Sequence, residues 1–178
     1  MIKKLKRAFS HIRSIIVNPR RYFTKIVADG NMEEAMFKAF LYGLAGGVLV
    51  FVINLLTGAS FTIGSLFSAL IITPVIAVGV LFIMGGLMML VSEITGGERD
   101  WEIAIKGLAS VFFMYPVILG LNALAFNCVS MWVISILVDA YVLFLFYNIA
   151  LYAMRGNRAN VAMVIAIIAM FMVTVYAT

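Results

Sequence analysis

Two long apolar segments joined by one short charged loop constrain the fold of this chain more than any other feature. They cover residues 64–91 and 103–126, and each contains one proline, Pro74 or Pro116. The loop between them, residues 92–102, is the most polar stretch outside the N-terminal arm. A helix that crosses a bilayer needs about 20 mostly apolar residues, so both segments are long enough to span a membrane. This pattern predicts a polytopic membrane protein.

The composition of the chain supports the same conclusion. Its 178 residues are 65 % hydrophobic and 12 % charged, whereas soluble domains are about 45–50 % apolar and about 25 % charged. We therefore expect an all-α fold, a polytopic membrane helical bundle, with short interfacial amphipathic helices before five transmembrane helices. These five spans are predicted at residues 37–56, 64–91, 103–126, 129–154 and 161–178. Residues 1–36 then form a basic cytoplasmic or interfacial arm, and residues 37–178 form the transmembrane domain.

Several classes of function are disfavoured by what the sequence lacks. It has one cysteine, Cys128, and one histidine, His11, so an internal disulfide is excluded and a His/Cys metal site within one chain is not expected. No catalytic triad, pair of catalytic carboxylates or HExxH metal helix is present, and we expect neither an enzyme nor a cofactor. The net charge of +5 would suggest nucleic acid in a soluble protein. Here the positive charge follows membrane topology, and no nucleic-acid partner is expected.

The start of the chain combines an apolar stripe with many basic side chains. The apolar residues at helical spacing are Ile2, Leu5, Phe9, Ile12 and Ile16. The basic residues fall largely away from that stripe or follow it: Lys3, Lys4, Lys6, Arg7, Arg13, Arg20 and Arg21. The pattern is typical of a helix that lies in the membrane interface, with basic residues in contact with anionic lipid headgroups. A solvated basic tail is the alternative.

Two sequence signals predict where the next helices begin. Asn18 followed by Pro19 is typical of an N-cap and first helical position, and Gly30 would end the short helix that follows. Asn31 with Glu34 three residues later resembles a capping box. The second signal predicts the start of the helix that continues into the first span.

The distribution of basic residues predicts the orientation. Nine of the thirteen Lys and Arg residues lie at or before Lys38, and the others are Arg99, Lys106, Arg155 and Arg158. The turns after the first and third spans contain none. With five spans, all thirteen fall on one side of the membrane, which the positive-inside rule makes cytoplasmic. We expect the N-terminus inside and the C-terminus outside.

Small residues and prolines interrupt the spans. Gly43 and Gly47 form a small-residue face that allows close helix contact, but such faces are common in membrane helices and are weak evidence for a homo-oligomer. Pro74 predicts a kink in the second span. Pro116 cannot donate a hydrogen bond to the carbonyl of Phe112, so a local bend or an open backbone acceptor is expected in the third span.

Three stretches resemble the Yip1 domain family of five-span membrane proteins. Residues 18–23, Asn-Pro-Arg-Arg-Tyr-Phe, are similar to the family's x-P-x-x-F/Y-F segment ahead of the first span. Residues 96–101, Gly-Gly-Glu-Arg-Asp-Trp, resemble its Gly-Gly-containing cytoplasmic loop after a long second span. Residues 114–116, Met-Tyr-Pro, resemble its Y-x-x-P or Y-P element in the third span. The resemblance covers most of the chain, and the topology carries more of it than any one motif.

The resemblance implies a short prokaryotic-type member. Eukaryotic members have a long cytoplasmic N-terminal region and are associated with Rab GTPases and ER-to-Golgi traffic, whereas the arm here is short. A prokaryotic-type member implies an integral protein of the cytoplasmic (inner) membrane. Because a fold does not fix a function, the resemblance implies topology far more than mechanism.

One acidic residue, Asp139, lies deep inside a predicted span. A buried ionisable group costs several kcal/mol unless it is paired or protonated, so it is a candidate functional site. Ser135 lies one turn earlier on the same face, and candidate partners on other spans are Asn54, Thr73, Tyr115 and Asn122. The group could serve as a proton or cation site or line a substrate path. A protonated or hydrogen-bonded carboxyl that locks helices together is the structural alternative. Likewise, Tyr115 and Pro116 could form a hinge, a polar cavity or a simple packing kink.

The charged loop offers a second group of candidates. Gly96 and Gly97 permit a tight loop, and Arg99 and Trp101 would lie at the level of the lipid headgroups. They are candidates for contact with a lipid or a protein, and interfacial anchoring is the simpler interpretation. The Gly-Gly pair is not a nucleotide loop, because no Gly-Lys-Ser/Thr follows it.

Two functions of different classes follow from these observations. The first is a non-enzymatic integral membrane protein that organises lipids or a protein partner through its cytoplasmic face. The second is a small transporter or channel with Asp139 in a polar path. A cavity lined by Asp139, Asn122, Tyr115 and Asn54 would favour transport, and dry packing around Asp139 would favour the first function.

Overall fold

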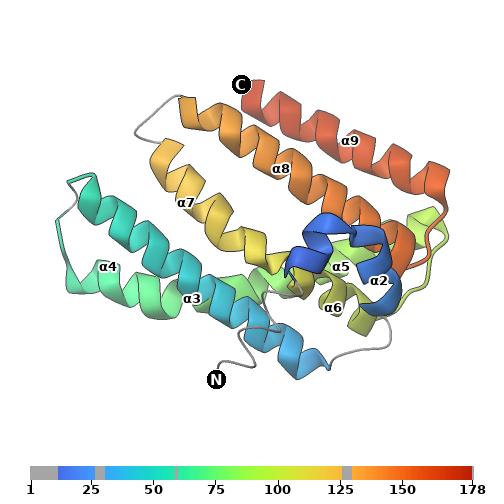
Figure 1. Ribbon diagram of the computed structural model, residues 1–178, viewed down its shortest axis with the longest axis horizontal. Coiled ribbons are helices and arrows are strands. Elements are labelled where there is room, and N and C mark those ends of the chain that lie inside the picture. The colour runs from blue at the N-terminus through green and yellow to red at the C-terminus, as the bar shows by residue number, and fades with distance from the viewer. Residues whose placement is uncertain (1–11, 27–30, 59, 126–129, 178) are drawn as a thin grey trace.

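The computed structural model describes residues 12–26, 31–58, 60–125 and 130–177, and all regular secondary structure in these ranges is helical (Figure 1). Residues 12–17 are helical, and the elements that follow in chain order are α2 (Pro19–Ile26), α3 (Met32–Leu56), α4 (Ile63–Phe67), η1 (Ser68–Ile72), α5 (Thr73–Thr95), α6 (Trp101–Val111), η2 (Phe112–Met114), α7 (Tyr115–Ala125), α8 (Ser130–Asn148), η3 (Ile149–Ala153) and α9 (Arg158–Ala177). The expected all-α class is confirmed.

Four continuous helical segments are long and apolar enough to cross a membrane. They are Met32–Leu56, Ile63–Thr95, Trp101–Ala125 and Met131–Ala153. They coincide with the first four predicted spans. The fifth predicted span corresponds to α9, whose segment Arg158–Met172 is a shorter apolar helix, and its role as a span stays a prediction. The predicted boundary between arm and transmembrane domain, at residues 36 and 37, falls inside the continuous helix α3.

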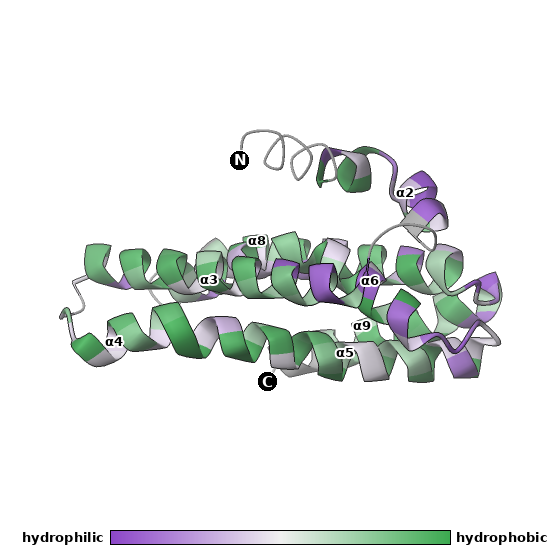
Figure 2. Cartoon of the chain, turned by 90° about the horizontal axis from the view of Figure 1, so that it is seen from below, coloured by the Kyte–Doolittle hydropathy of each residue, from purple (hydrophilic) through white to green (hydrophobic). Residues whose placement is uncertain are grey.

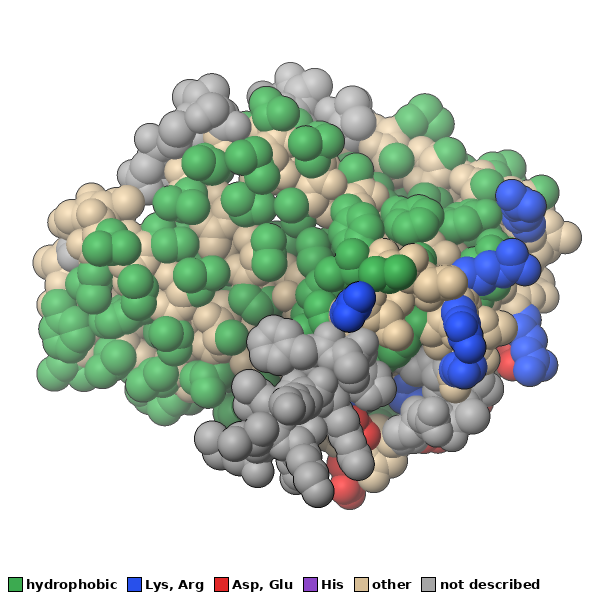
Figure 3. All heavy atoms as spheres, viewed as in Figure 1, with side chains coloured by type: hydrophobic (Ala, Val, Ile, Leu, Met, Phe, Trp, Pro, Cys, Tyr) green, Lys and Arg blue, Asp and Glu red, His purple; other side chains and the backbone are tan. Residues whose placement is uncertain are grey.

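The polar and apolar parts of the molecule are separated along the bundle axis. In Figure 2, α4 and α5 run along one side of the bundle, α3 and α8 along the other, and α2 lies outside the second layer. Hydrophilic residues gather at the end where α5 joins α6 and α8 joins α9. Figure 3 shows Lys and Arg side chains at that end and apolar side chains over most of the remaining face. We call the end of the bundle where α5 joins α6 and α8 joins α9 the charged end.

The centre of the bundle at the charged end is α6. Eight of its eleven residues are buried: Ile103, Ala104, Ile105, Gly107, Leu108, Ala109, Ser110 and Val111. The helix contacts α2, α3, α5, α8 and η3. Its small residues, among them Ala104, Gly107 and Ala109, allow neighbouring helices to approach closely.

Both helix starts predicted from asparagine caps are confirmed. The Oδ1 atom of Asn18 accepts a hydrogen bond from the N–H of Arg21 at 3.2 Å, where α2 begins. The Oδ1 atom of Asn31 accepts one from the N–H of Glu34 at 2.9 Å, where α3 begins. Each cap satisfies a backbone donor that has no partner within its own helix. Gly30 lies outside the described residues.

Both prolines lie beside local changes in helix type. The π-helical turn η1 directly precedes Pro74, and the N–H of Thr73 donates to the carbonyl of Ser68, five residues back. The 3₁₀ turn η2 (Phe112–Met114) lies just before Pro116. The expected irregularities in the second and third spans are therefore present, because a proline removes one donor from the regular hydrogen-bond ladder.

The small-residue face of the first span packs within the chain. A Cβ atom on Gly43 would lie 2.5 Å from the Cβ of Ala77 and 2.8 Å from the Cα of Pro74. A Cβ on Gly46 would lie 3.3 Å from the Cα of Pro116, and Gly47 lies directly against the backbone of Ala69. These glycines let α3 contact both proline-containing spans closely. The face is occupied inside the bundle and is not available for contact with a second copy.

Candidate functional site

Two connections that are far apart in the sequence meet at the charged end. The N–H of Glu98 donates to the carbonyl of Met154 at 2.7 Å, and the N–H of Asn157 donates to the carbonyl of Thr95 at 2.9 Å. We call the structure formed by residues 92–98 and 150–157 the loop junction. Backbone hydrogen bonds of this kind hold the α5–α6 and α8–α9 connections in one fixed arrangement.

Two buried hydroxyl groups support the loop junction. Ser92 and Thr95 are each 0 % exposed. The Ser92 hydroxyl donates to the carbonyl of Glu98 at 2.7 Å, and the Thr95 hydroxyl donates to the carbonyl of Ser92 at 3.2 Å. Buried polar groups persist when they are hydrogen-bonded, so these bonds explain two polar side chains at the end of an apolar helix.

The glycines of the loop junction have a packing role. Gly96 ends α5 with a φ of +73°, in the left-handed region that glycine adopts freely. A Cβ on Gly97 would lie 2.5 Å from the carbonyl oxygen of Met154 and 3.2 Å from the Cα of Gly156. Arg155 adopts a φ of +55°, which is uncommon for a residue with a side chain. The junction therefore depends on residues without side chains at Gly97 and Gly156.

The charged side chains at this end are largely paired. Arg99 forms an ion pair with Glu93 at 3.0 Å, and Arg155 forms one with Glu98 at 2.6 Å. Trp101 is half-buried and stacks on Phe82, with ring centroids 6.1 Å apart. Its indole thus packs against α5, and its predicted position at the level of the lipid headgroups stays a prediction. Exposed ion pairs contribute little stability, so their main effect is to set the local charge pattern.

The N-terminal arm docks on the bundle at the same end. Ile15 is 1 % exposed and Phe23 is 0 % exposed. The predicted apolar stripe includes Ile16, which is 53 % exposed, so the described part of the arm places Ile15 and not Ile16 against the protein. The guanidinium of Arg20 lies 5.4 Å from the centroid of the Tyr152 ring, a cation–π contact.

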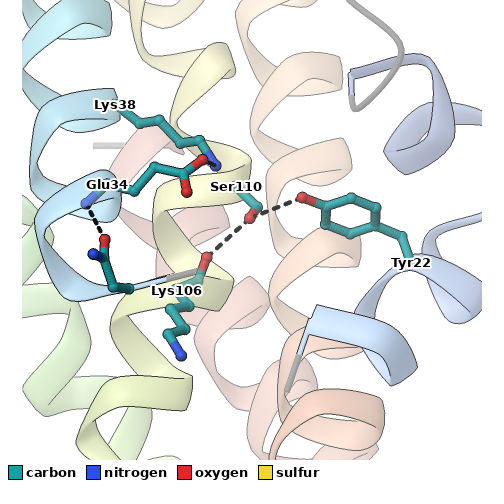
Figure 4. A network of polar contacts seen from close by, with 6 residues as sticks. Tyr22, Glu34, Lys38, Lys106 and Ser110 are labelled. Atoms are coloured by element: carbon teal, nitrogen blue, oxygen red, sulfur yellow. Dashed lines mark hydrogen bonds and ion pairs between the residues drawn. The ribbon is translucent and has the colours of Figure 1, made fainter. Parts of the chain in front are cut away.

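A short chain of hydrogen bonds connects the arm to the central helix. The Tyr22 hydroxyl donates to Oγ of Ser110 at 3.2 Å, and the Ser110 hydroxyl donates to the carbonyl of Lys106 at 2.9 Å (Figure 4). An ion pair between Lys38 and Glu34, at 2.9 Å, lies on α3 in the same view. The arm, α3 and α6 therefore meet in a polar region at the charged end. Tyr22 was part of the family-like segment, but the sequence held no signal for its partner Ser110.

Docking leaves the basic side chains of the described arm at the surface. Arg13, Arg20, Arg21 and Lys25 are all exposed. Arg21 and Lys25 form no ion pair with a described residue. The remaining predicted headgroup contacts, Lys3, Lys4, Lys6 and Arg7, lie outside the described residues. An exposed group of cations at one end of a membrane protein attracts anionic lipid headgroups.

One groove in the bundle includes some of the polar residues predicted inside the spans. Asn54 lines a groove with Thr73, and Asp139, Tyr115 and Asn122 do not contribute to that groove. Asn122 is exposed and Asp139 is half-buried. The groove at Asn54 is therefore not the shared polar cavity that would favour transport.

The local environments of the remaining candidates differ from one another. Tyr115 stacks on Phe112 with ring centroids 5.5 Å apart, and Pro116 packs against α3 at Gly46. Ser135 is buried, and its hydroxyl has no hydrogen-bond partner among the described residues. Ser135 and Asp139 lie one turn apart on α8, but the Ser135 hydroxyl forms no hydrogen bond with the Asp139 carboxyl group.

Comparison of the chain with family models, with curated proteins and with solved structures gave no match. In the part of the chain that the structure describes, no three His, Cys, Asp or Glu side chains lie close enough together to hold a metal ion. The charged end combines the docked arm with the loop junction, and we take it as the candidate functional site.

Proposed function

We propose that the chain is a five-span, non-enzymatic membrane protein of the Yip1 type that binds anionic lipid headgroups at its charged end and organises lipids or a protein partner there. The observation that carries this proposal is the docked arm. Its apolar side chain Phe23 is fully buried against the bundle, while Arg21 and Lys25 stay exposed beside it. A preformed surface of this kind loses less conformational entropy on binding than a flexible tail would.

The arrangement of charge supports a lipid ligand. The carboxylates of Glu93 and Glu98 are paired with Arg99 and Arg155, so they do not neutralise the cations of α2. The surface of a cytoplasmic leaflet is negative because of its anionic lipids. The basic residues of α2 and the connecting loops lie at the same end of the bundle, where the membrane interface would be.

Neutralising the exposed arm cations Arg21 and Lys25 should weaken the binding of anionic lipid. Each Lys or Arg near the surface contributes about 1 kcal/mol, so the double variant Arg21→Gln/Lys25→Gln should lose about 2 kcal/mol, roughly thirtyfold in affinity at low salt. Native mass spectrometry of the detergent-solubilised protein, titrated with phosphatidylserine and with phosphatidylcholine, measures both affinities. High salt should remove the difference between variant and wild type.

The control for this experiment is the double variant Glu34→Gln/Lys38→Gln. It removes an ion pair at the same end without a change in net charge, and it should leave the phosphatidylserine affinity within about twofold, since exposed pairs contribute little. Equal binding of phosphatidylserine and phosphatidylcholine by the wild type would contradict the proposal.

The five-span topology is tested by accessibility labelling of single cysteines in oriented membranes. The distribution of the thirteen basic residues predicts that positions near Gly97 and Asn157 react on the cytoplasmic side. Positions near Ser60 and Thr178 should react on the other side. Labelling of Gly97 and Ser60 positions from the same side would rule out five spans.

A transporter or channel that uses Asp139 is the second candidate function. It is favoured by the half-buried carboxyl group of Asp139 on the apolar helix α8. One turn away lies the buried hydroxyl of Ser135, which has no hydrogen-bond partner among the described residues. Intramembrane ionisable groups commonly mark ion or proton pathways. The lipid-binding function has more support, because Asp139, Tyr115 and Asn122 do not contribute to the groove that Asn54 lines.

The variant Asp139→Asn separates these two functions. An amide keeps the size of the side chain and a hydrogen-bond donor but does not titrate, so a structural role predicts near-normal stability and unchanged lipid binding. A proton-site role predicts normal folding and loss of proton flux in reconstituted vesicles. In the Asp139→Leu variant, a partner left without its hydrogen bond would lower stability by about 1–3 kcal/mol. Wild-type stability, lipid binding and flux in both variants would exclude Asp139 as either a structural or a transport residue.

A further inference from the structure

A groove with an unusual polar lining lies at the end of the bundle opposite the charged end. It has a volume of about 260 Å³ and lies between α3 and the segment formed by α4 and η1. Its polar lining residues are Asn54, Ser60, Ser65, Ser68 and Thr73, and its apolar lining includes Phe51, Leu55 and Leu119. None of its lining residues is charged.

Part of this polar lining is free to bind a ligand. The Ser65 hydroxyl donates to the carbonyl of Thr62 at 2.7 Å, and the Thr73 hydroxyl donates to the carbonyl of Ser68 at 3.0 Å. In contrast, the side chains of Asn54, Ser60 and Ser68 form no hydrogen bond with any described residue. An amide and two hydroxyls supply both donors and acceptors to the groove.

One backbone carbonyl at the inner end of the groove leaves the regular helix ladder. In a regular α-helix the N–H of Thr73 would donate to the carbonyl of Ala69, but in the π-helical turn it donates to Ser68. The next residue, Pro74, has no N–H. The carbonyl of Ala69 is therefore released from the helix ladder, and its oxygen packs against the backbone of Gly47 at the inner end of the groove. Interrupted membrane helices with released carbonyls are typical of binding sites.

The lining and the size limit the class of ligand. A charged ligand would find no opposite charge in the groove, and burial of an unpaired charge is unfavourable. A dehydrated cation, held by oxygens about 2.3–2.6 Å away, would not fill about 260 Å³. Hydroxyl groups on a short carbon skeleton match both the free hydrogen-bonding groups and the apolar wall at Phe51 and Leu119.

We infer that the groove binds a neutral, hydroxyl-bearing group of about the size of glycerol. Two sources can present this group: a free polyol, or the glycerol headgroup of a phospholipid such as phosphatidylglycerol. In either case Asn54 and Ser68 bind its hydroxyls, and Phe51, Leu55 and Leu119 contact its carbon atoms. This site is separate from the charged end and does not depend on the function proposed for that end.

The test measures the reactivity of a cysteine in the groove. The full-length protein carries Cys128→Ala to remove the native thiol and Ser60→Cys as the probe, and it is placed in nanodiscs with an uncharged maleimide. A matched probe, Ile63→Cys, lies at the same end, is exposed and does not line the groove. Three conditions are compared: phosphatidylcholine with added glycerol, phosphatidylglycerol, and phosphatidylserine, which has the same charge as phosphatidylglycerol but no glycerol headgroup.

We expect slower labelling of Ser60→Cys, and unchanged labelling of Ile63→Cys, when the ligand is present. Protection by glycerol in phosphatidylcholine would identify a free polyol. Protection by phosphatidylglycerol and by neither glycerol nor phosphatidylserine would identify the lipid headgroup. Equal labelling of Ser60→Cys in all three conditions would overturn the inference, and so would equal protection by phosphatidylglycerol and phosphatidylserine.

Two groove variants test whether the protection comes from the assigned residues. Asn54→Ala and Ser68→Ala each remove a hydrogen-bonding side chain, and together they should raise the half-protecting ligand concentration about tenfold. The control is Ser135→Ala, which removes a buried hydroxyl on α8 away from the groove, and it should keep full protection. Full protection in the Asn54→Ala/Ser68→Ala variant would overturn the assignment of the groove as the binding site.

Discussion

Replacement of Gly47 with alanine should destabilise the bundle more than any other single methyl insertion in a helix. The added Cβ would lie 3.0 Å from the carbonyl carbon of Ala69 and closer still to its oxygen. These are backbone atoms beside the π-helical turn and cannot rotate away. Accommodation therefore requires that α3 and η1 move apart, and overpacking of this kind costs about 3 kcal/mol or more.

The measurement is the thermal unfolding midpoint of the protein in detergent. A loss of about 3 kcal/mol corresponds to a fall of about 6–12 °C for a chain of this length. The matched control is Gly79→Ala on α5, where no atom lies within 4 Å of the new Cβ. Alanine has a higher helix propensity than glycine by about 1 kcal/mol, so the control should be neutral or slightly stabilising. Equal midpoints for the two variants would show that α3 does not pack on η1 as described.

Replacement of Gly97 with alanine should open the loop junction. Its Cβ would lie 2.5 Å from the carbonyl oxygen of Met154 and 2.6 Å from Oγ of Ser92. Relief of this clash breaks the hydrogen bonds of Glu98 to Met154 and of Ser92 to Glu98. Because Ser92 is fully buried, an unpaired hydroxyl adds to the cost, and we expect a total loss of about 2–4 kcal/mol.

Hydrogen exchange measures this opening directly. The amides of Glu98 and Asn157, which bridge the two connections, should lose protection by a factor of about 30 to 900. The control is Gly86→Ala, where the nearest atom would be Cζ3 of Trp101 at an ordinary 3.9 Å, and it should leave both amides protected. Unchanged exchange at Glu98 and Asn157 in Gly97→Ala would refute the role given to Gly97.

The features that the sequence predicted correctly depend on short-range chemistry. A bilayer requires about 20 apolar residues in succession, so four long helices were predictable from their composition. The caps at Asn18 and Asn31 depend on one side chain and a backbone N–H three residues later. The irregular turns at Pro74 and Pro116 follow from a missing N–H. Each of these effects acts within about one helical turn.

The features that only the tertiary structure decided depend on contacts between distant segments. Thr95 and Asn157 bond across the loop junction, and Tyr22 finds Ser110 on another helix. The sequence indicated that Gly97 is a loop residue but could not show that it packs on the α8–α9 connection. Glycine is common both in turns and at close backbone contacts, and the sequence does not distinguish the two. Similarly, an amphipathic arm has the same sequence pattern whether its apolar face contacts lipid or protein. Only the tertiary structure shows that Phe23 is buried against the bundle. Local chemistry thus determined the helices, and packing between helices decided which polar groups meet.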